Sequence, residues 1–332
     1  MLIPDEKVAA EDATGGQTQK IVYNSGIMNT HIFRSATFLA LGAALISGTN
    51  NFITKIAVTA VKDPVVFTTL KNAIVAAFII GIIIVWKKRS ELASLSPKQK
   101  KLLILIGIIG GSIPFILYFT GLKLTSALNA SLIHKTLFVW VAIMAVPILK
   151  EKIGWLQFAA MGLLFGGTIA VGGFQGFKLN TGELMILGAT LFWAVENIIA
   201  KIVLKDISSI LLAGARMVLG SIILFAVMLF QNKAQMMTGL NLIQWSWTLL
   251  TSALLLGYVL SWYTALKYAP ATVVASLLVP ATLITNILTA IFVTHTMPNI
   301  QIVSSVLLGL GTILLLYGIR RQGKIRQAVL SY

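Results

Sequence analysis

The chain has 332 residues, of which 57% are apolar and 11% charged, and its mean hydropathy is +0.90. Soluble domains carry about 25% charged residues, so this composition predicts a membrane protein. The absence of cysteine excludes a disulfide framework and a cysteine-ligated metal, and three histidines make other metal sites improbable, so we expect no cofactor. The net charge of +16 comes from Lys and Arg between apolar runs, which argues against a nucleic-acid partner.

Residues 1–33 differ from the rest of the chain because they mix acidic, basic and small polar side chains. The acidic residues stand where a signal peptide would be basic, and no short apolar core follows them, so we expect no cleaved leader. The composition predicts a cytoplasmic tail without fixed structure. Residues 321–332 form a second, basic cytoplasmic tail.

Ten apolar runs lie between these tails, and each is long enough to cross a bilayer as an α-helix. They are apolar on all sides rather than in alternation, which excludes a β-barrel. We therefore predict an all-α integral membrane protein with helices over 36–58, 64–86, 102–122, 126–149, 153–174, 183–204, 208–230, 245–266, 271–293 and 300–319. Lys and Arg gather in alternate connections, which predicts a multi-pass protein of the inner or plasma membrane with both termini cytoplasmic.

The two halves of the chain resemble each other at a spacing of about 145 residues. Segment 50–56 aligns with segment 196–202, and Lys71 aligns with Arg216. Each copy holds five predicted helices, an odd number, so the second copy must cross the membrane in the opposite direction. Inverted repeats are typical of secondary transporters, which bind substrate near the bilayer midplane between the two halves.

Several short motifs also carry a family resemblance. They are Asn50-Asn51-Phe52 through Lys55, Asp63-Pro64, Leu122-Lys123-Leu124-Thr125-Ser126-Ala127 through Ala130-Ser131-Leu132, Lys150-Glu151-Lys152, and Ala265-Leu266-Lys267-Tyr268 through Ala275-Ser276-Leu277 and Pro280. On these motifs the chain resembles the EamA-like transporters of the drug/metabolite transporter superfamily, with repeats over 34–178 and 179–320. The resemblance implies a central cavity lined by predicted helices 1, 3, 4, 6, 8 and 9.

The chain departs from the family pattern at two places. His134-Lys135-Thr136 stands where such proteins often have a proline, and the second repeat has no counterpart of Glu151. The first departure points to a specialised pocket.

Charged residues at membrane depth need a partner or a function, because burying them there is costly. Lys135 lies about nine residues, or roughly 14 Å, into its helix, close to the midplane. It is predicted either to bind a substrate carboxylate or phosphate or to form a buried ion pair. The adjacent His134 would orient the substrate, carry a proton or only pack.

Glu196 is the one acidic residue well inside a predicted helix. It could pair with Lys135, bind a substrate amine or carry a proton, and the sequence does not decide between these roles. Lys55 and Lys201 lie near helix ends, where their long stems are expected to reach the lipid headgroups.

The remaining candidates are polar, aromatic or helix-breaking residues. Asn51 and Asn197, from the matched segments, and the aromatic residues Tyr118, Trp262 and Tyr263 complete the predicted substrate site. Residues expected to serve helix packing or gating are Lys71, Arg216, Pro114 and Pro280. The spacings Gly107 to Gly111 and Gly162 to Gly166 predict close helix contacts.

Together these patterns predict a secondary active transporter that exports an amino acid or related organic anion by alternating access, with protons coupled through Glu196 or His134. The alternatives are an exporter of lipophilic cations that uses Glu196 and, third, a passive channel, which would need like residues at matched depths. Neither catalytic constellations nor a nucleotide-binding loop occur in the sequence, so we expect no enzyme. One chain suffices for a complete cavity, and the sequence leaves monomer and homodimer open.

Overall fold

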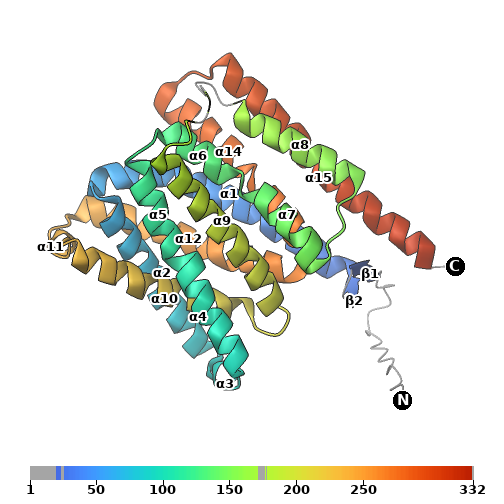
Figure 1. Cartoon of the computed structure of the whole chain (residues 1–332), viewed down its shortest axis with the longest axis horizontal. Coiled ribbons are helices and arrows are strands. Elements are labelled where there is room, and N and C mark those ends of the chain that lie inside the picture. Colours follow the sequence, from blue (N-terminus) through green and yellow to red (C-terminus); the bar gives the residue numbers. More distant parts are fainter. Residues whose placement is uncertain (1–19, 24–25, 171–175, 177, 331–332) are drawn as a thin grey trace.

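The computed structural model describes residues 20–23, 26–170, 176 and 178–330. Most of the predicted N-terminal tail, residues 1–19, lies outside the described residues. Two short strands, β1 (Lys20–Tyr23) and β2 (Gly26–Asn29), pair in antiparallel fashion before the first helix begins. The sequence analysis did not predict this strand pair, which packs beside the C-terminal helix (Figure 1).

The rest of the described chain is helical (Figure 1). The first repeat contains α1 (Thr30–Val61), α2 (Pro64–Val85), α3 (Arg89–Ala93), α4 (Pro97–Gly111), α5 (Ile113–Leu122), α6 (Ala127–Lys135), α7 (Leu137–Leu149) and α8 (Trp155–Ile169). The second contains α9 (Thr181–Val203), α10 (Ser209–Phe230), α11 (Gln235–Thr238), α12 (Leu242–Tyr268), α13 (Ala271–Leu278), α14 (Ala281–Thr289), the π-helical turn η1 (Ala290–Thr294) and α15 (Asn299–Leu330).

Nine helical segments in the described part of the chain are long and apolar enough to cross a membrane. The remaining predicted span, 153–174, which is the fifth in chain order, corresponds to α8, an apolar helix of 15 residues. At 1.5 Å per residue it is about 22 Å long, shorter than a typical hydrocarbon core. The predicted all-α membrane fold is confirmed, and α8 is the shortest of the helical segments that correspond to the ten predicted spans.

Packing follows the repeat. The first helix of each copy, α1 or α9, packs along the third span of the other copy, which is α12 for α1 and the α4–α5 pair for α9. The last helices, α8 and α15, pack against each other at one side of the bundle (Figure 1). Equivalent pairs are therefore formed by equivalent helices, as two inverted copies require.

Three of the spans are interrupted near their middle. The break between α4 and α5 falls at Ser112, just before Pro114, and the break between α13 and α14 falls just before Pro280. Both agree with the expectation that proline interrupts a helix, since proline lacks the backbone N–H. The third break, at Thr136 between α6 and α7, has no proline beside it.

The Thr136 side chain accounts for this third break. Its hydroxyl donates to the carbonyl of Ile133 at 2.6 Å and accepts a hydrogen bond from Trp140 Nε1 at 3.0 Å. A threonine hydroxyl that bonds to a nearby carbonyl competes with the helical ladder. Lys135 aligns with Pro280 in the repeat and Thr136 follows directly, so different chemistry interrupts the two equivalent spans within one residue of the same point.

The bundle has two ends, named here after one acidic residue at each. The Glu151 end comprises the connections 86–96, 150–154, 204–208 and 269–270, and the Asp63 end comprises 62–63, 123–126, 178–180 and 295–298.

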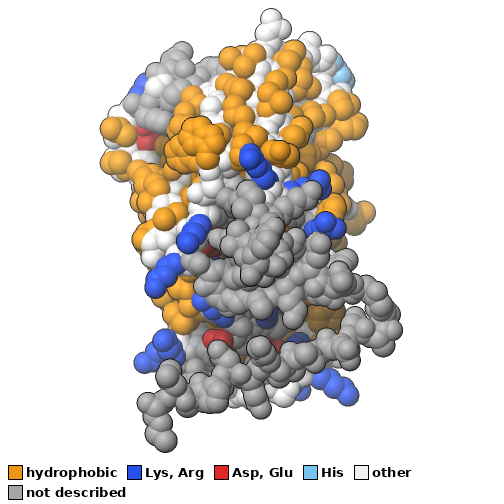
Figure 2. All heavy atoms as spheres, turned by 90° about the vertical axis from the view of Figure 1, so that its right-hand side faces the viewer, with side chains coloured by type: hydrophobic (Ala, Val, Ile, Leu, Met, Phe, Trp, Pro, Cys, Tyr) orange, Lys and Arg blue, Asp and Glu red, His pale blue; other side chains and the backbone are white. Residues whose placement is uncertain are grey.

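Figure 2, which faces the right-hand side of Figure 1, shows Lys and Arg side chains over the lower part of that face and hydrophobic side chains above them.

Candidate functional site: a central cavity between the repeats

A cavity of about 430 Å³ lies in the middle of the bundle, within the range of small-molecule sites. Both repeats contribute to it, through the spans that include α1, α2, α5, α6, α9, α10, α12, α13 and α14. All the predicted substrate residues line this one cavity: Asn51, Tyr118, His134, Lys135, Glu196, Asn197, Trp262 and Tyr263. Lys71 and Arg216, which we expected to serve packing or gating, also line it, whereas Pro114 and Pro280 lie at the helix breaks beside it.

Four of the lining residues are Lys, Arg or Glu: Lys71, Lys135, Glu196 and Arg216. In the described part of the chain, no ion pair within 4.0 Å joins any of them. The ion pairs found there are Lys88–Glu91 and Lys233–Asp63, both outside the membrane-spanning helices. The sequence left open whether Lys135 and Glu196 pair with each other. The lack of an ion pair between them favours the alternative, in which each side chain faces the cavity on its own.

Glu196 is held in place from two sides. Only 2% of its surface is exposed, and the Tyr263 hydroxyl donates to its Oε1 at 2.6 Å. Gly110 of α4 packs directly on the Glu196 side chain, where a Cβ atom would collide with Cγ. The Trp193 indole donates to the Gly110 carbonyl at 3.0 Å, which fixes α4 against α9. These contacts restrict the movement of the Glu196 side chain.

Aromatic rings form one wall of the cavity. The His134 ring lies edge-on to Trp193, with centroids 4.7 Å apart, and 5.6 Å from Tyr118. Such edge contacts are favoured by the charge distribution of aromatic rings. Tyr258 and Trp262 stack on another side with centroids 5.9 Å apart.

Sequence reasoning missed two of these aromatic residues, Trp193 and Tyr258. A signal existed for both, since Trp193 precedes Asn197 by four residues and Tyr258 precedes Trp262 by four. Residues four apart lie on the same face of a helix, so each should accompany its partner into the cavity.

At the Glu151 end, the two repeats are joined across the interrupted spans. The Glu151 carboxylate accepts hydrogen bonds from the backbone N–H groups of Ala271 and Thr272 at 2.7 and 3.0 Å, and from the Thr272 hydroxyl at 2.7 Å. It thereby caps the N-terminus of α13, where unpaired N–H groups and the helix dipole favour an anion. In addition, α7 packs against α13.

The Asp63 end differs at the equivalent place. The loop 294–296 aligns with Lys150-Glu151-Lys152, but the Thr294 and Thr296 hydroxyls bond within the loop itself. Among the described residues, α6 and α14 form no packing contact comparable to that of α7 with α13. The cavity is lined by both α6 and α14, so it lies between the halves that do not meet.

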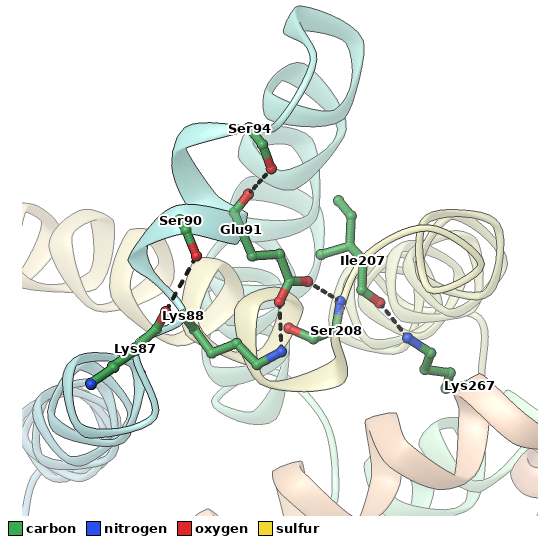
Figure 3. Close-up of polar contacts among 8 residues, drawn as sticks. All are labelled: Lys87, Lys88, Ser90, Glu91, Ser94, Ile207, Ser208 and Lys267. Carbon is green, nitrogen blue, oxygen red and sulfur yellow. Dashed lines mark hydrogen bonds and ion pairs between the residues drawn. The ribbon is translucent and has the colours of Figure 1, made fainter.

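A second contact between the repeats occurs at both ends. Figure 3 shows it at the Glu151 end, where Glu91 accepts from the backbone of Ser208 at 2.7 Å and pairs with Lys88 at 2.9 Å. Burial alone would raise the pKa of Glu91, but these hydrogen bonds and the Lys88 charge lower it overall. The counterpart at the other end is the ion pair of Asp63 with Lys233 at 2.7 Å. The contact made by Glu91 at one end thus has an equivalent, the Asp63–Lys233 pair, at the other end. The contact of Glu151 with α13 is found at one end only among the described residues.

Lys201 was expected to reach the lipid headgroups, but its side chain turns to the end of a neighbouring helix instead. Its Nζ atom donates to the carbonyls of Leu266 and Ala269, both at 2.7 Å, and of Lys267 at 3.2 Å. These carbonyls belong to the C-terminus of α12, where a cation is favoured by the helix dipole. Lys55 is exposed, as expected for a lysine near a helix end.

Comparison with known proteins adds to this geometry. A family model described as the EamA-like transporter family matches the chain twice, over residues 34–173 and 180–317. An "Uncharacterized transporter" of Methanothermobacter thermautotrophicus is 24% identical over 149 residues, which is 43% of this chain and 43% of that protein. The "Uncharacterized transporter YyaM" of Bacillus subtilis is 29% identical over 148 residues, which is 43% of this chain and 48% of that protein.

The aligned region thus spans less than half the length of these curated relatives. A solved structure described as "Crystal structure of protein" superposes with a TM-score of 0.71 at 17% identity, covering 87% of this chain and 98% of that one. At this identity the likeness concerns the fold alone.

Proposed function

Because the chain belongs to the EamA-like transporter family, we propose that it is a secondary active transporter that exports a small polar metabolite, an amino acid or a related organic anion. The observation that carries this proposal is the central cavity, which lies between two inverted repeats and collects three cationic side chains and one carboxylate. Intramembrane charges mark substrate or ion paths more often than they serve packing. The cavity is built from one chain, so a monomer suffices for transport, and a homodimer would hold two such sites.

Alternating access is supported by the unequal ends of the bundle. At the Glu151 end, α7 meets α13 and Glu151 caps α13, whereas α6 and α14 stay apart toward the Asp63 end. The repeat predicts a second arrangement in which α6 meets α14 and α7 separates from α13. With the Glu151 end and both termini in the cytoplasm, as the distribution of Lys and Arg favours, the present arrangement faces outward.

Protons are the coupling ion that the lining residues favour. Glu196 and His134 are titratable groups on the cavity wall, and either could bind a proton in one arrangement and release it in the other. Export would then be driven by an inward proton gradient.

The second candidate is an exporter of lipophilic cations. The rings of Tyr118, Trp193 and Trp262, which line the same cavity as the carboxylate of Glu196, favour it, since aromatic faces attract cations. Lys71, Lys135 and Arg216, which line the same cavity, oppose it, because a cationic substrate would be repelled by all three.

Counterflow in proteoliposomes separates these candidates. Vesicles containing the full chain are loaded in turn with amino acids, organic acids, phosphorylated metabolites and a lipophilic cation, and uptake of the labelled compound is measured. We expect accelerated exchange of an amino acid or organic anion that is lost in Lys135→Ala and retained in Lys101→Ala, a lysine exposed at the start of α4. Exchange of the lipophilic cation that survives Lys135→Ala would refute the substrate assignment. Flux without saturation or trans-stimulation would indicate a channel.

A further inference from the structure

The charges of the cavity specify its substrate more narrowly. Resting on the proposed transport function, we propose that the preferred substrate is an organic dianion whose negative charges are bound by Lys71 and Lys135. It is either a dicarboxylate, with one charge on each of two groups, or a phosphate monoester, with both charges on one group.

The first argument is charge balance. Three cationic side chains and one carboxylate line the cavity, an excess of two positive charges when all are in their ordinary states. A zwitterion would leave this excess uncompensated and a cation would enlarge it, whereas a dianion cancels it. Since uncompensated charges in a poorly solvated site are strongly unfavourable, the dianion is the best match.

The second argument identifies the two cations that lack a counter-charge. Arg216 and Glu196 both lie against Gly110, where a Cβ atom would collide with Glu196 Cγ and lie 3.2 Å from Arg216 Nε. Arg216 therefore has a carboxylate beside it, and the Tyr263 hydroxyl bonds to the same carboxylate. In the described part of the chain, neither Lys71 Nζ nor Lys135 Nζ has a hydrogen-bond or ion-pair partner. Lys71 Nζ lies 5.1 Å from the centroid of the Phe67 ring, a contact that does not neutralise it.

The two lysines come from different walls of the cavity. Lys71 lies on α2, which packs against α10 and α12, and Lys135 ends α6, which packs against α9. No packing contact between α2 and α6 is comparable to these among the described residues. Two separated cations suit a dicarboxylate, with an anionic group at each end, better than a phosphate monoester, whose two charges lie on one group.

The third argument comes from unpartnered polar atoms on the cavity wall. Arg216 Nε and Asn286 Nδ2 are buried donors without an acceptor among the described residues, and His134 Nδ1 and Asn197 Oδ1 are also without partners. Buried donors without acceptors are unfavourable until a ligand supplies acceptor atoms. Carboxylate or phosphate oxygens supply several.

The test is a series of ligands of similar size and different charge. Succinate, its monomethyl ester and its dimethyl ester carry two, one and no negative charges, and glycerol 3-phosphate with glycerol forms a second series. Binding to the purified full chain is measured by thermal stabilisation, and transport by counterflow. We expect succinate or glycerol 3-phosphate to bind at least roughly tenfold more tightly than the matched monoanion or neutral compound. Whichever series shows the larger preference identifies a dicarboxylate or a phosphate as the substrate class.

Charge-removing and charge-keeping variants test the two lysines. Lys71→Gln and Lys135→Gln should each abolish the preference for succinate over its monomethyl ester, Lys71→Arg and Lys135→Arg should retain it, and Lys101→Gln should leave it unchanged. The inference would be overturned without any variant if the wild type showed no preference for the dianion in either series, or if it bound a zwitterion such as leucine more tightly than both dianions. Counterflow of a zwitterion alone would overturn this inference and leave the transporter proposal intact. Selective binding of the dianion without counterflow would support this inference and overturn the transporter proposal.

Discussion

Glu151 offers the sharpest test of how the cavity is closed at one end. Its carboxylate receives three hydrogen bonds from the first turn of α13, a helix of only eight residues. Loss of an N-cap costs about 1 kcal/mol, and removal of an anion from a helix N-terminus costs up to about 1 kcal/mol more. We therefore expect Glu151→Ala to weaken closure of this end by about 2 kcal/mol, a change of roughly 30-fold in the ratio of the two arrangements.

The absence of native cysteine makes this ratio measurable by labelling. Ser131 of α6 and Ala275 of α13 lie within one position of equivalence in the two repeats, and both line the cavity. In single-cysteine proteins, an impermeant maleimide added at the Asp63 end should label Ser131→Cys and, added at the Glu151 end, should spare Ala275→Cys. Adding Glu151→Ala should raise labelling at position 275 and lower it at position 131.

Two variants control for nonspecific effects of charge. Glu151→Gln keeps one acceptor oxygen without the charge and should give an intermediate shift. Asp206→Ala removes an exposed acid at the same end of the bundle and should give none. If Glu151→Ala is labelled like the unmodified protein at both positions, the contact does not hold this end closed and the reasoning fails.

Three further predictions concern single contacts. Tyr263→Phe deletes the hydrogen bond to Glu196 and should destabilise the protein by about 1.5–3 kcal/mol, seen as a lower melting temperature in detergent; an unchanged melting temperature would contradict this. Gly110→Ala places a methyl group against Glu196 and should cost about 1–3 kcal/mol, whereas Gly166→Ala, with nothing within 4 Å of the new atom, should be neutral; both are measured by thermal unfolding. Burial tends to raise the pKa of Asp63, but the bonds from its lysine partner and two backbone N–H groups lower it overall from 3.8. A lowered folded-state pKa gives stability that is present above 3.8 and lost as the pH falls below it, so the deficit of Asp63→Asn should shrink in acid; an equal deficit at every pH would argue against the ion pair.

The repeat explains why the candidate site could be found from sequence. Segments 50–56 and 196–202 align, and equivalent positions of inverted copies must face the same space between them. The apolar runs likewise fixed the helices, because backbone groups in lipid must be satisfied within each segment.

Other features depend on local packing that a pattern does not encode. The helix breaks at Thr136 because its hydroxyl donates a hydrogen bond to the carbonyl of Ile133. Lys201 turns toward the end of α12 instead of the membrane surface. Of the two glycine spacings, the one at Gly107 and Gly111 lies against α10, as predicted, whereas nothing lies within 4 Å of a Cβ at Gly162 or Gly166. Which residue approaches a glycine is decided by the orientation of the neighbouring helix.

The single Glu151 contact has a consequence for how the two compartments are sensed. In a carrier that rests with one end closed, a ligand arriving at the open end meets nearly every molecule in a competent form. A ligand arriving at the closed end meets only the minority that has opened, so its apparent affinity is reduced by that fraction although the binding residues are the same. An acid that touches no substrate can thus make a carrier respond to low concentrations on one side and only to accumulation on the other, while the gradients still set the direction of net flow.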